Sequence, residues 1–150
     1  MTLEVTLLLV EDDAVDAEAI QRAFRQQRIA NAFVVARDGV EALAALRGDG
    51  RAGGVPRPYV VLLDLNMPRM NGVEFLEALR TDPALAASVV FVLTTSDRDE
   101  DKQAAYDRHV AGYILKSRAG VDFLDVVRLL GAYWQLVEFP PTPAALSVHD

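Results

Sequence analysis

Short apolar runs rich in valine, leucine and isoleucine recur five times along the chain, at residues 6–10, 32–36, 59–63, 89–93 and 112–115. Continuous apolar runs of this length predict strands covered on both faces, as in a parallel sheet. Five longer stretches with helical signals alternate with them, at residues 14–28, 39–47, 72–80, 97–109 and 120–136. This alternation predicts an α/β fold in which five helices cover a doubly wound sheet of five parallel strands.

Several aspartates are expected to begin helices. Asp38 with Glu41, and likewise Asp97 with Glu100, have the spacing of an N-cap and the acid that reciprocates it. Asp13 is expected to cap the first helix rather than to bind a metal ion. We therefore expect Asp13, Asp38 and Asp97 to cap helices.

The chain length of 150 residues predicts a single domain. We expect that domain over residues 5–137, followed by a proline-rich tail over residues 138–150 and no output domain. Residues 48–58, rich in glycine and proline, are expected to form a surface loop before the third strand.

The composition excludes several classes of function. The chain has 15 basic and 22 acidic residues and no cysteine. The acidic balance argues against a nucleic-acid partner, and the lack of cysteine excludes a thiol nucleophile, a thiolate zinc site and a disulfide scaffold. No apolar run approaches the ~20 residues that a membrane span needs, so we expect a cytoplasmic protein with no membrane partner.

Polar side chains follow four of the five predicted strands directly, and they are Glu11, Asp12, Asp64, Thr94 and Lys116. The carboxyl ends of parallel strands meet at one edge of the sheet, where open α/β proteins bind ligands. Three carboxylates placed together repel one another unless a cation neutralises them. Because the donors are oxygens without nearby histidine or cysteine, the expected ion is Mg²⁺.

Asp64 is the best candidate for a covalent role, because it follows the most apolar of the predicted strands and precedes a turn. Aspartate can accept a phosphoryl group to form an acyl phosphate. The ammonium group of Lys116 can balance phosphate charge, and the Thr94 hydroxyl can donate a hydrogen bond to a phosphoryl oxygen. The predicted chemistry is phosphoryl transfer.

These motifs resemble the receiver domains of two-component response regulators over about residues 5–136. The resemblance rests on the segments 9–13, 63–68 with Gly72, 93–94 and 112–116. It implies a flavodoxin-like fold with strand order 2-1-3-4-5. It also implies that a partner histidine kinase phosphorylates Asp64.

The resemblance implies roles for the neighbouring residues as well. Asp12 and Asp64 would bind Mg²⁺ directly, the Asn66 main-chain carbonyl would be a further ligand, and Glu11 would act through water. Lys116 would contact the phosphoryl group, and Thr94 and Tyr113 would switch on phosphorylation.

The chain departs from the family pattern at Ser117, where receivers usually have a proline after the lysine. A cis bond before a non-proline residue is costly, so we expect a trans Lys116–Ser117 peptide and a differently shaped loop. The fourth helix offers only Ala104, Ala105 and Tyr106 as apolar anchors, so we expect it to shift easily.

The fifth helix carries two apolar stripes, one more than a helix covering a sheet requires. The surplus predicts a homodimer interface, for which we expect Val126, Leu129, Tyr133, Trp134, Leu136 and Val137. The end of this helix and the long loop before the third strand are similar to single-domain regulators associated with bacterial phytochromes. That narrower resemblance implies a dimer and a light-sensing histidine kinase, a bacteriophytochrome, as partner.

Two other functions remain as alternatives. A metal-dependent phosphohydrolase of the dehalogenase type also forms an aspartyl phosphate, but it carries a second Asp two residues later, where this chain has Asn66. A degenerate receiver would act only as a binding module, against which the five polar residues at the strand ends argue. We therefore expect a phosphoacceptor signalling protein rather than an enzyme.

Overall fold

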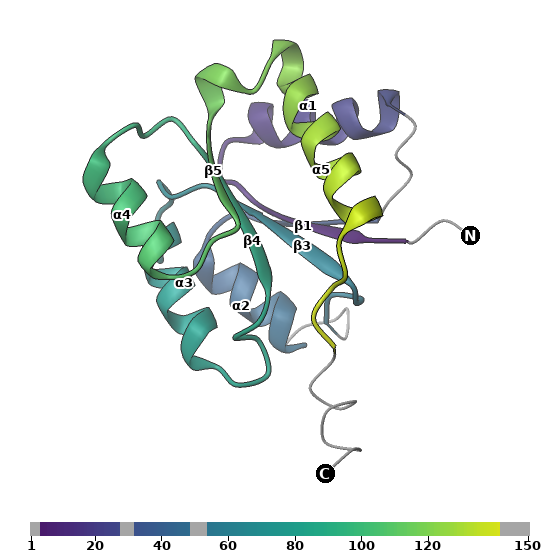
Figure 1. The fold of residues 1–150 in the computed structure, drawn as a ribbon. Coiled ribbons are helices and arrows are strands. Elements are labelled where there is room, and N and C mark those ends of the chain that lie inside the picture. Colours follow the sequence, from purple (N-terminus) through teal and green to yellow (C-terminus); the bar gives the residue numbers. More distant parts are fainter. Residues whose placement is uncertain (1–3, 28–31, 49–53, 142–150) are drawn as a thin grey trace.

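The computed structural model describes residues 4–27, 32–48 and 54–141. Within these residues, the strands form one parallel sheet in the order β2-β1-β3-β4-β5 (Figure 1). The strands are β1 (Thr6–Val10), β2 (Phe33–Ala36), β3 (Tyr59–Leu63), β4 (Val89–Thr94) and β5 (Gly112–Leu115). The predicted fold class and strand order are confirmed.

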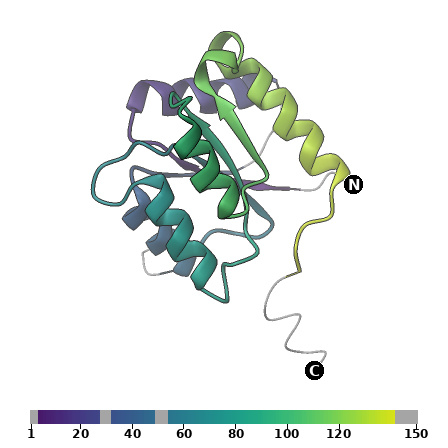
Figure 2. The same cartoon turned by 60° about the vertical axis from the view of Figure 1, so that its left-hand side comes forward.

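Helices cover both faces of the sheet. In the described part of the chain they are α1 (Ala14–Gln26), α2 (Gly39–Arg47), α3 (Gly72–Thr81), α4 (Asp99–Asp107) and α5 (Leu124–Leu136). Figures 1 and 2 show α1 and α5 on one face and α2, α3 and α4 on the other. Among the described residues, no helix combines the length and the apolar character needed to cross a membrane.

The core consists of two buried clusters separated by the sheet. On one side, Phe75, Leu76 and Leu79 of α3 pack with alternate residues of the strands. On the other, Phe24 of α1 and Trp134 of α5 pack with the remaining strand residues. Because β3 is buried on both faces, its carboxyl end at Asp64 lies between the two layers of helices.

The helix ends follow the sequence signals in part. The Asp13 side chain accepts from the Val15 and Asp16 amides, which confirms it as the N-cap of α1. The prediction that Asp97 begins the fourth helix is wrong. Helix α4 begins at Asp99 after Arg98, which makes no side-chain cap hydrogen bond, and the Ser96 hydroxyl donates to Asp101 in the first turn.

Helix α5 corrects the predicted interface. Val126 and Trp134 are buried in the core of this chain, and the Trp134 ring stacks on Phe24 with ring centroids 5.7 Å apart. Helix α5 packs against both the sheet and α1, so it buries a wider arc than the sheet alone would require. Of the predicted residues, Leu129 and Leu136 are exposed.

Two predictions fall partly outside the described residues. The predicted surface loop over residues 48–58 includes residues 49–53, and the proline-rich tail includes residues 142–150. Phe139 lies in the described part of that tail and packs against the cluster formed by α1 and α5.

Candidate functional site

The polar residues predicted at the strand ends lie together at the carboxyl edge of the sheet. One carboxylate oxygen from each of Glu11, Asp12 and Asp64 lies within 4.8 Å of the others. Glu11 and Asp64 are buried, whereas Asp12 is exposed. Three convergent oxygen donors of this kind fit a hard divalent cation.

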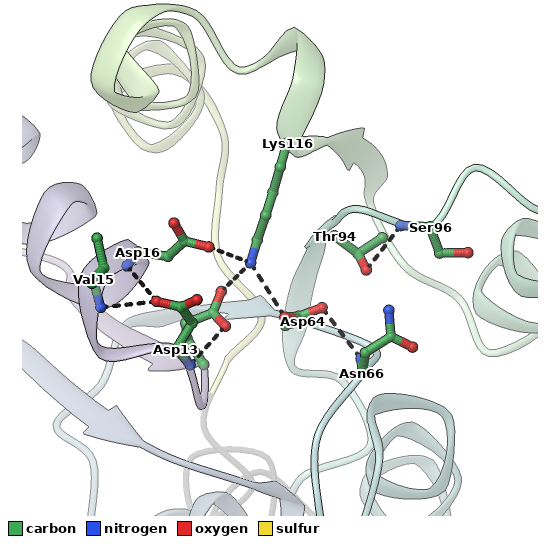
Figure 3. Close-up of polar contacts among 9 residues, drawn as sticks. Asp13, Val15, Asp16, Asp64, Asn66, Thr94, Ser96 and Lys116 are labelled. Atoms are coloured by element: carbon green, nitrogen blue, oxygen red, sulfur yellow. Dashed lines mark hydrogen bonds and ion pairs between the residues drawn. The ribbon is translucent and has the colours of Figure 1, made fainter.

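Lys116 reaches this cluster from the end of β5. Its Nζ lies 2.7 Å from Glu11 Oε1, 2.8 Å from Asp16 Oδ2 and 3.3 Å from Asp64 Oδ2 (Figure 3). Burial alone would lower the pKa of Lys116, but the hydrogen bonds to Asp16 and Glu11 and the charge on Asp64 outweigh it. The pKa is raised above its usual range, so Lys116 is a fixed cation at the site.

Glu11 is the group most affected by its surroundings. Burial raises its pKa from 4.5 to about 7, the hydrogen bond from Lys116 opposes this rise, and the nearby charge of Asp64 adds to it. Burial and the charge of Asp64 together therefore outweigh the hydrogen bond from Lys116. A bound cation would add the missing positive charge, which is the chemical reason that this donor set fits a divalent metal.

The chain around Asp64 is anchored on both sides. The Asp64 amide donates to the Val10 carbonyl at 3.0 Å, and Asp64 Oδ1 accepts from the Asn66 amide at 3.2 Å. Gly72 lies so close that a Cβ there would meet the Asp64 carbonyl oxygen at 2.7 Å. The carboxylate thus projects from a tightly fixed turn.

A second chain of hydrogen bonds leads from the site towards α4. Thr94 is fully buried, and its hydroxyl accepts from the Ser96 amide at 3.4 Å. Tyr113 donates from its hydroxyl to the Ser96 carbonyl at 2.8 Å. Burial raises the pKa of Tyr113, which remains a neutral donor. The two predicted switch residues therefore meet at the same residue, Ser96, just before α4.

Sequence reasoning missed two acids. Asp16, on the first turn of α1, holds Lys116 but has no signal in the sequence apart from its place one turn after Asp12. Asp38 was assigned only as a helix cap, yet it is buried and forms an ion pair with Arg69 in the loop after Asp64. Its position just beyond the second strand could have pointed to the same edge of the sheet.

The trans peptide expected before Ser117 is confirmed. The Lys116–Ser117 peptide is not cis, and Lys116 begins a short 3₁₀ turn over Lys116–Arg118. Lys116 nevertheless reaches Asp64. The loss of the usual proline therefore does not remove the lysine from the site.

Comparisons with known proteins show which proteins this chain resembles. Residues 7–128 match the response regulator receiver domain family. Response regulator Rcp1 of Synechocystis sp. is 37% identical over 93% of this chain and 93% of its own length. Its Mn²⁺-bound crystal structure has a TM-score of 0.79, 36% identity, and coverage of 91% of this chain and 99% of that one.

Two further solved structures are similar over most of the chain. The phosphorylated cyanobacterial phytochrome response regulator RcpA has a TM-score of 0.82 and 35% identity, covering 93% of this chain and 100% of that one. The bacteriophytochrome response regulator RtBRR has a TM-score of 0.71 and 32% identity, covering 97% of this chain and 88% of that one.

Proposed function

This chain belongs to the response regulator receiver domain family, and we propose that Asp64 is its phosphoacceptor, charged by a histidine kinase with the help of Mg²⁺. The observation that carries the proposal is the meeting of Glu11, Asp12 and Asp64 with Lys116 at one edge of the sheet. The proposed domain spans residues 5–137.

In the proposed reaction, an Asp64 oxygen attacks the phosphorus of a phosphohistidine. The new oxygen–phosphorus bond forms as the phosphorus–nitrogen bond breaks, and the imidazole leaves. Asp12, Asp64 and the Asn66 carbonyl would hold Mg²⁺ directly and Glu11 would hold it through water. When bound, the ion supplies positive charge to the phosphoryl oxygens.

Lys116 and Thr94 would then bind the phosphoryl oxygens. The ammonium of Lys116, already 3.3 Å from Asp64, can pair with a phosphoryl oxygen. The Thr94 hydroxyl can donate to another phosphoryl oxygen, which would alter its contact with the Ser96 amide. Because Tyr113 holds the carbonyl of the same residue, we propose that the change passes to Tyr113 and α4.

The proposed partner is a histidine kinase, and a bacteriophytochrome is the candidate. RcpA and RtBRR, whose names associate them with phytochromes, resemble this chain over most of its length. The cytoplasmic location stays a prediction from the sequence. We propose a signalling protein rather than a phosphohydrolase, because Asn66 offers no carboxyl group at the position where a dehalogenase-type enzyme has its general acid.

We further propose a homodimer through α5, with the interface reduced to Leu129, Tyr133, Leu136 and Val137. Leu129 is 45% exposed and Leu136 is 85% exposed. These leucines are seven residues apart, so they lie on the same side of the helix. Tyr133 lies between them in sequence and is half-buried against Phe91, with ring centroids 5.0 Å apart.

The phosphoacceptor is tested by labelling with acetyl phosphate in the presence of Mg²⁺. We expect Asp64→Asn to abolish labelling, because the amide cannot form a stable acyl phosphate. Asp82→Asn is the matched control, since Asp82 lies at the end of α3 in an ion pair with Arg47. Labelling of Asp64→Asn at the level of the control would overturn the assignment.

The dimer is tested by sedimentation of Leu129→Asp at tens of micromolar. A charge buried in the proposed interface should weaken association at least tenfold, an effect of about 1.4 kcal/mol or more. Gln135→Asp adds the same charge to a different, exposed side of α5 and should leave association unchanged. A monomeric parent protein, or equal behaviour of the two variants, would contradict the proposed interface.

A further inference from the structure

The loop between β3 and α3 is held against the beginning of α2. The Gly39 amide, at the start of α2, donates to the Met70 carbonyl at 3.0 Å. A Cβ on Gly39 would meet the Met70 Cγ at 2.6 Å, so the two segments are in close contact. This loop also carries Asn66, whose main-chain carbonyl is a proposed metal ligand. The start of α2 is therefore in a position to control that carbonyl.

An ion pair strengthens this contact beside Met70. Arg69 Nε lies 2.7 Å from Asp38 Oδ2, and its Nη2 lies 3.8 Å from Glu41 Oε2. The Asp38 side chain is only 4% exposed, whereas that of Arg69 is 58% exposed. The remaining oxygen of Asp38 accepts from the Glu41 amide at 2.9 Å. Asp38 thus ties Arg69 to a fixed helix end with both oxygens occupied.

The electrostatics of Asp38 agree with a permanent ion pair. Burial alone would raise the pKa of this carboxyl, but the hydrogen bonds from Arg69 and from the Glu41 amide outweigh it. The pKa lies below its usual range, so Asp38 is ionised at neutral pH. The Asp38–Arg69 ion pair is therefore present at neutral pH, where the receiver would bind its metal ion.

The backbone of Arg69 shows that the loop needs this support. Its φ angle is +62°, a left-handed conformation that residues other than glycine adopt at a cost. Such a conformation persists only where the surroundings hold it in place. Here the side chain of Arg69 and the carbonyl of Met70 are both fixed to the first residues of α2.

We propose that the Asp38–Arg69 ion pair is a positioning device that fixes the Asn66 carbonyl and thereby sets the affinity of the site for its divalent cation. The proposal rests on the proposed function, because it assigns the support of a ligand in that metal site. Neither Asp38 nor Arg69 is itself a ligand in it. The ion pair connects the segment after β2 with the loop that follows Asp64.

The direction in which cation affinity changes on substitution distinguishes a positioning role of the ion pair from a direct effect of its charges. Replacing Arg69 by Gln removes a positive charge from the neighbourhood, which by electrostatics alone would tighten cation binding. Replacing Asp38 by Asn removes a negative charge and would weaken it, while Asn still caps α2. Positioning instead predicts that both substitutions weaken binding, because each one breaks the same ion pair.

The experiment measures the Mn²⁺ dissociation constant by titration calorimetry without any phosphoryl donor. We expect Arg69→Gln and Asp38→Asn each to raise it by about tenfold, the lower end of the cost of losing outer support of a ligand. The double variant should be no weaker than the weaker single variant, since there is one pair to break. Arg69→Lys should recover part of the affinity, because lysine can pair with Asp38.

Two control variants distinguish failure of the positioning role from failure of the proposed metal site. Arg47→Gln breaks the Arg47–Asp82 ion pair elsewhere on α2 and should leave Mn²⁺ affinity unchanged. Asp12→Asn removes a direct ligand, so unchanged binding in that variant would overturn the proposed metal site itself. If Asp12→Asn weakens binding while Arg69→Gln leaves it unchanged or tightens it, the positioning role alone is wrong. Unfolding in urea without metal verifies that each variant is folded in the titration.

Discussion

The two segments that flank Asp64 differ in how firmly they are held. On one side, the loop after β3 is fixed to α2, and Phe75, Leu76 and Leu79 of the following α3 are buried completely. On the other, Ala105 is the buried residue of α4, and the Tyr106 side chain next to it is 51% exposed. The loop on the α3 side of Asp64, the proposed phosphoacceptor, is therefore firmly held by its contacts, and the side towards α4 is lightly packed.

The two ends of α4 differ as well. At its carboxyl end, Arg80 of α3 donates to the carbonyls of Arg108 and His109, and also to those of Ala86 and Ser88. At its amino end, the Ser96 hydroxyl donates to Asp101 and accepts from the Arg98 amide, and the Ser96 carbonyl accepts from the Tyr113 hydroxyl. A helix held in this way would pivot about its carboxyl end. The end nearest Thr94 is therefore the end that we expect to move if Asp64 is phosphorylated as proposed.

The largest expected effect tests the difference in packing between α3 and α4. Phe75→Ala should reduce the free energy of unfolding by about 4 kcal/mol, since it removes a fully buried ring from the core. Tyr106→Ala on α4 should cost less than about 1 kcal/mol, because half of that side chain is exposed. Urea denaturation measures both. Equal losses would erase the contrast between the two helices.

An intermediate effect is expected at Arg80. Arg80→Met should reduce the free energy of unfolding by about 1–2 kcal/mol, because half-buried carbonyls lose their charged donor. Hydrogen exchange should accelerate at the Ala111 amide, which bonds Val90 just beyond the pinned end of α4. Arg25→Gln, which breaks an exposed ion pair with Glu18, is the control. Faster exchange only at the amino end of α4 would mean that the pivot lies elsewhere.

The smallest effect concerns pH and the rigid side of the site. Because Arg69 and the Glu41 amide hold the pKa of Asp38 below its unfolded value of 3.8, the pair stabilises the fold fully above that pH. The contribution is lost as the pH falls through the folded pKa. The parent protein should therefore lose stability more steeply below pH 4 than Asp38→Asn. If stability falls equally with pH in the parent protein and in Asp38→Asn, the ion pair does not stabilise the folded protein.

The sheet and its polar edge could be predicted because both depend on local patterns. Four of the five strands are apolar runs that end directly in the polar residues of the site, as at Asp64, and the parallel sheet brings these ends to one edge. The contact between Asp38 and Arg69 joins residues 31 positions apart and leaves no comparable pattern. An acid at the start of a helix looks like a cap whether or not it also binds an arginine.

Errors in α4 and α5 have a related physical cause. Asp97 has the spacing of a cap, but α4 begins at Asp99, and the side chain that bonds to its first turn is Ser96, which donates to Asp101. Trp134 appeared available for a partner because a helical pattern shows apolar positions without showing which neighbour covers them. Phe24 of α1 covers it here.

The acceptors of Arg80 are main-chain carbonyls, which every amino acid carries. Substitution of the side chains at Ala86, Ser88, Arg108 or His109 would therefore leave those four acceptors in place. The outer surface of the α3–α4 region can diverge in sequence and acquire new recognition properties while its frame is preserved. These four contacts therefore depend on the Arg80 side chain and not on the side chains at the acceptor positions.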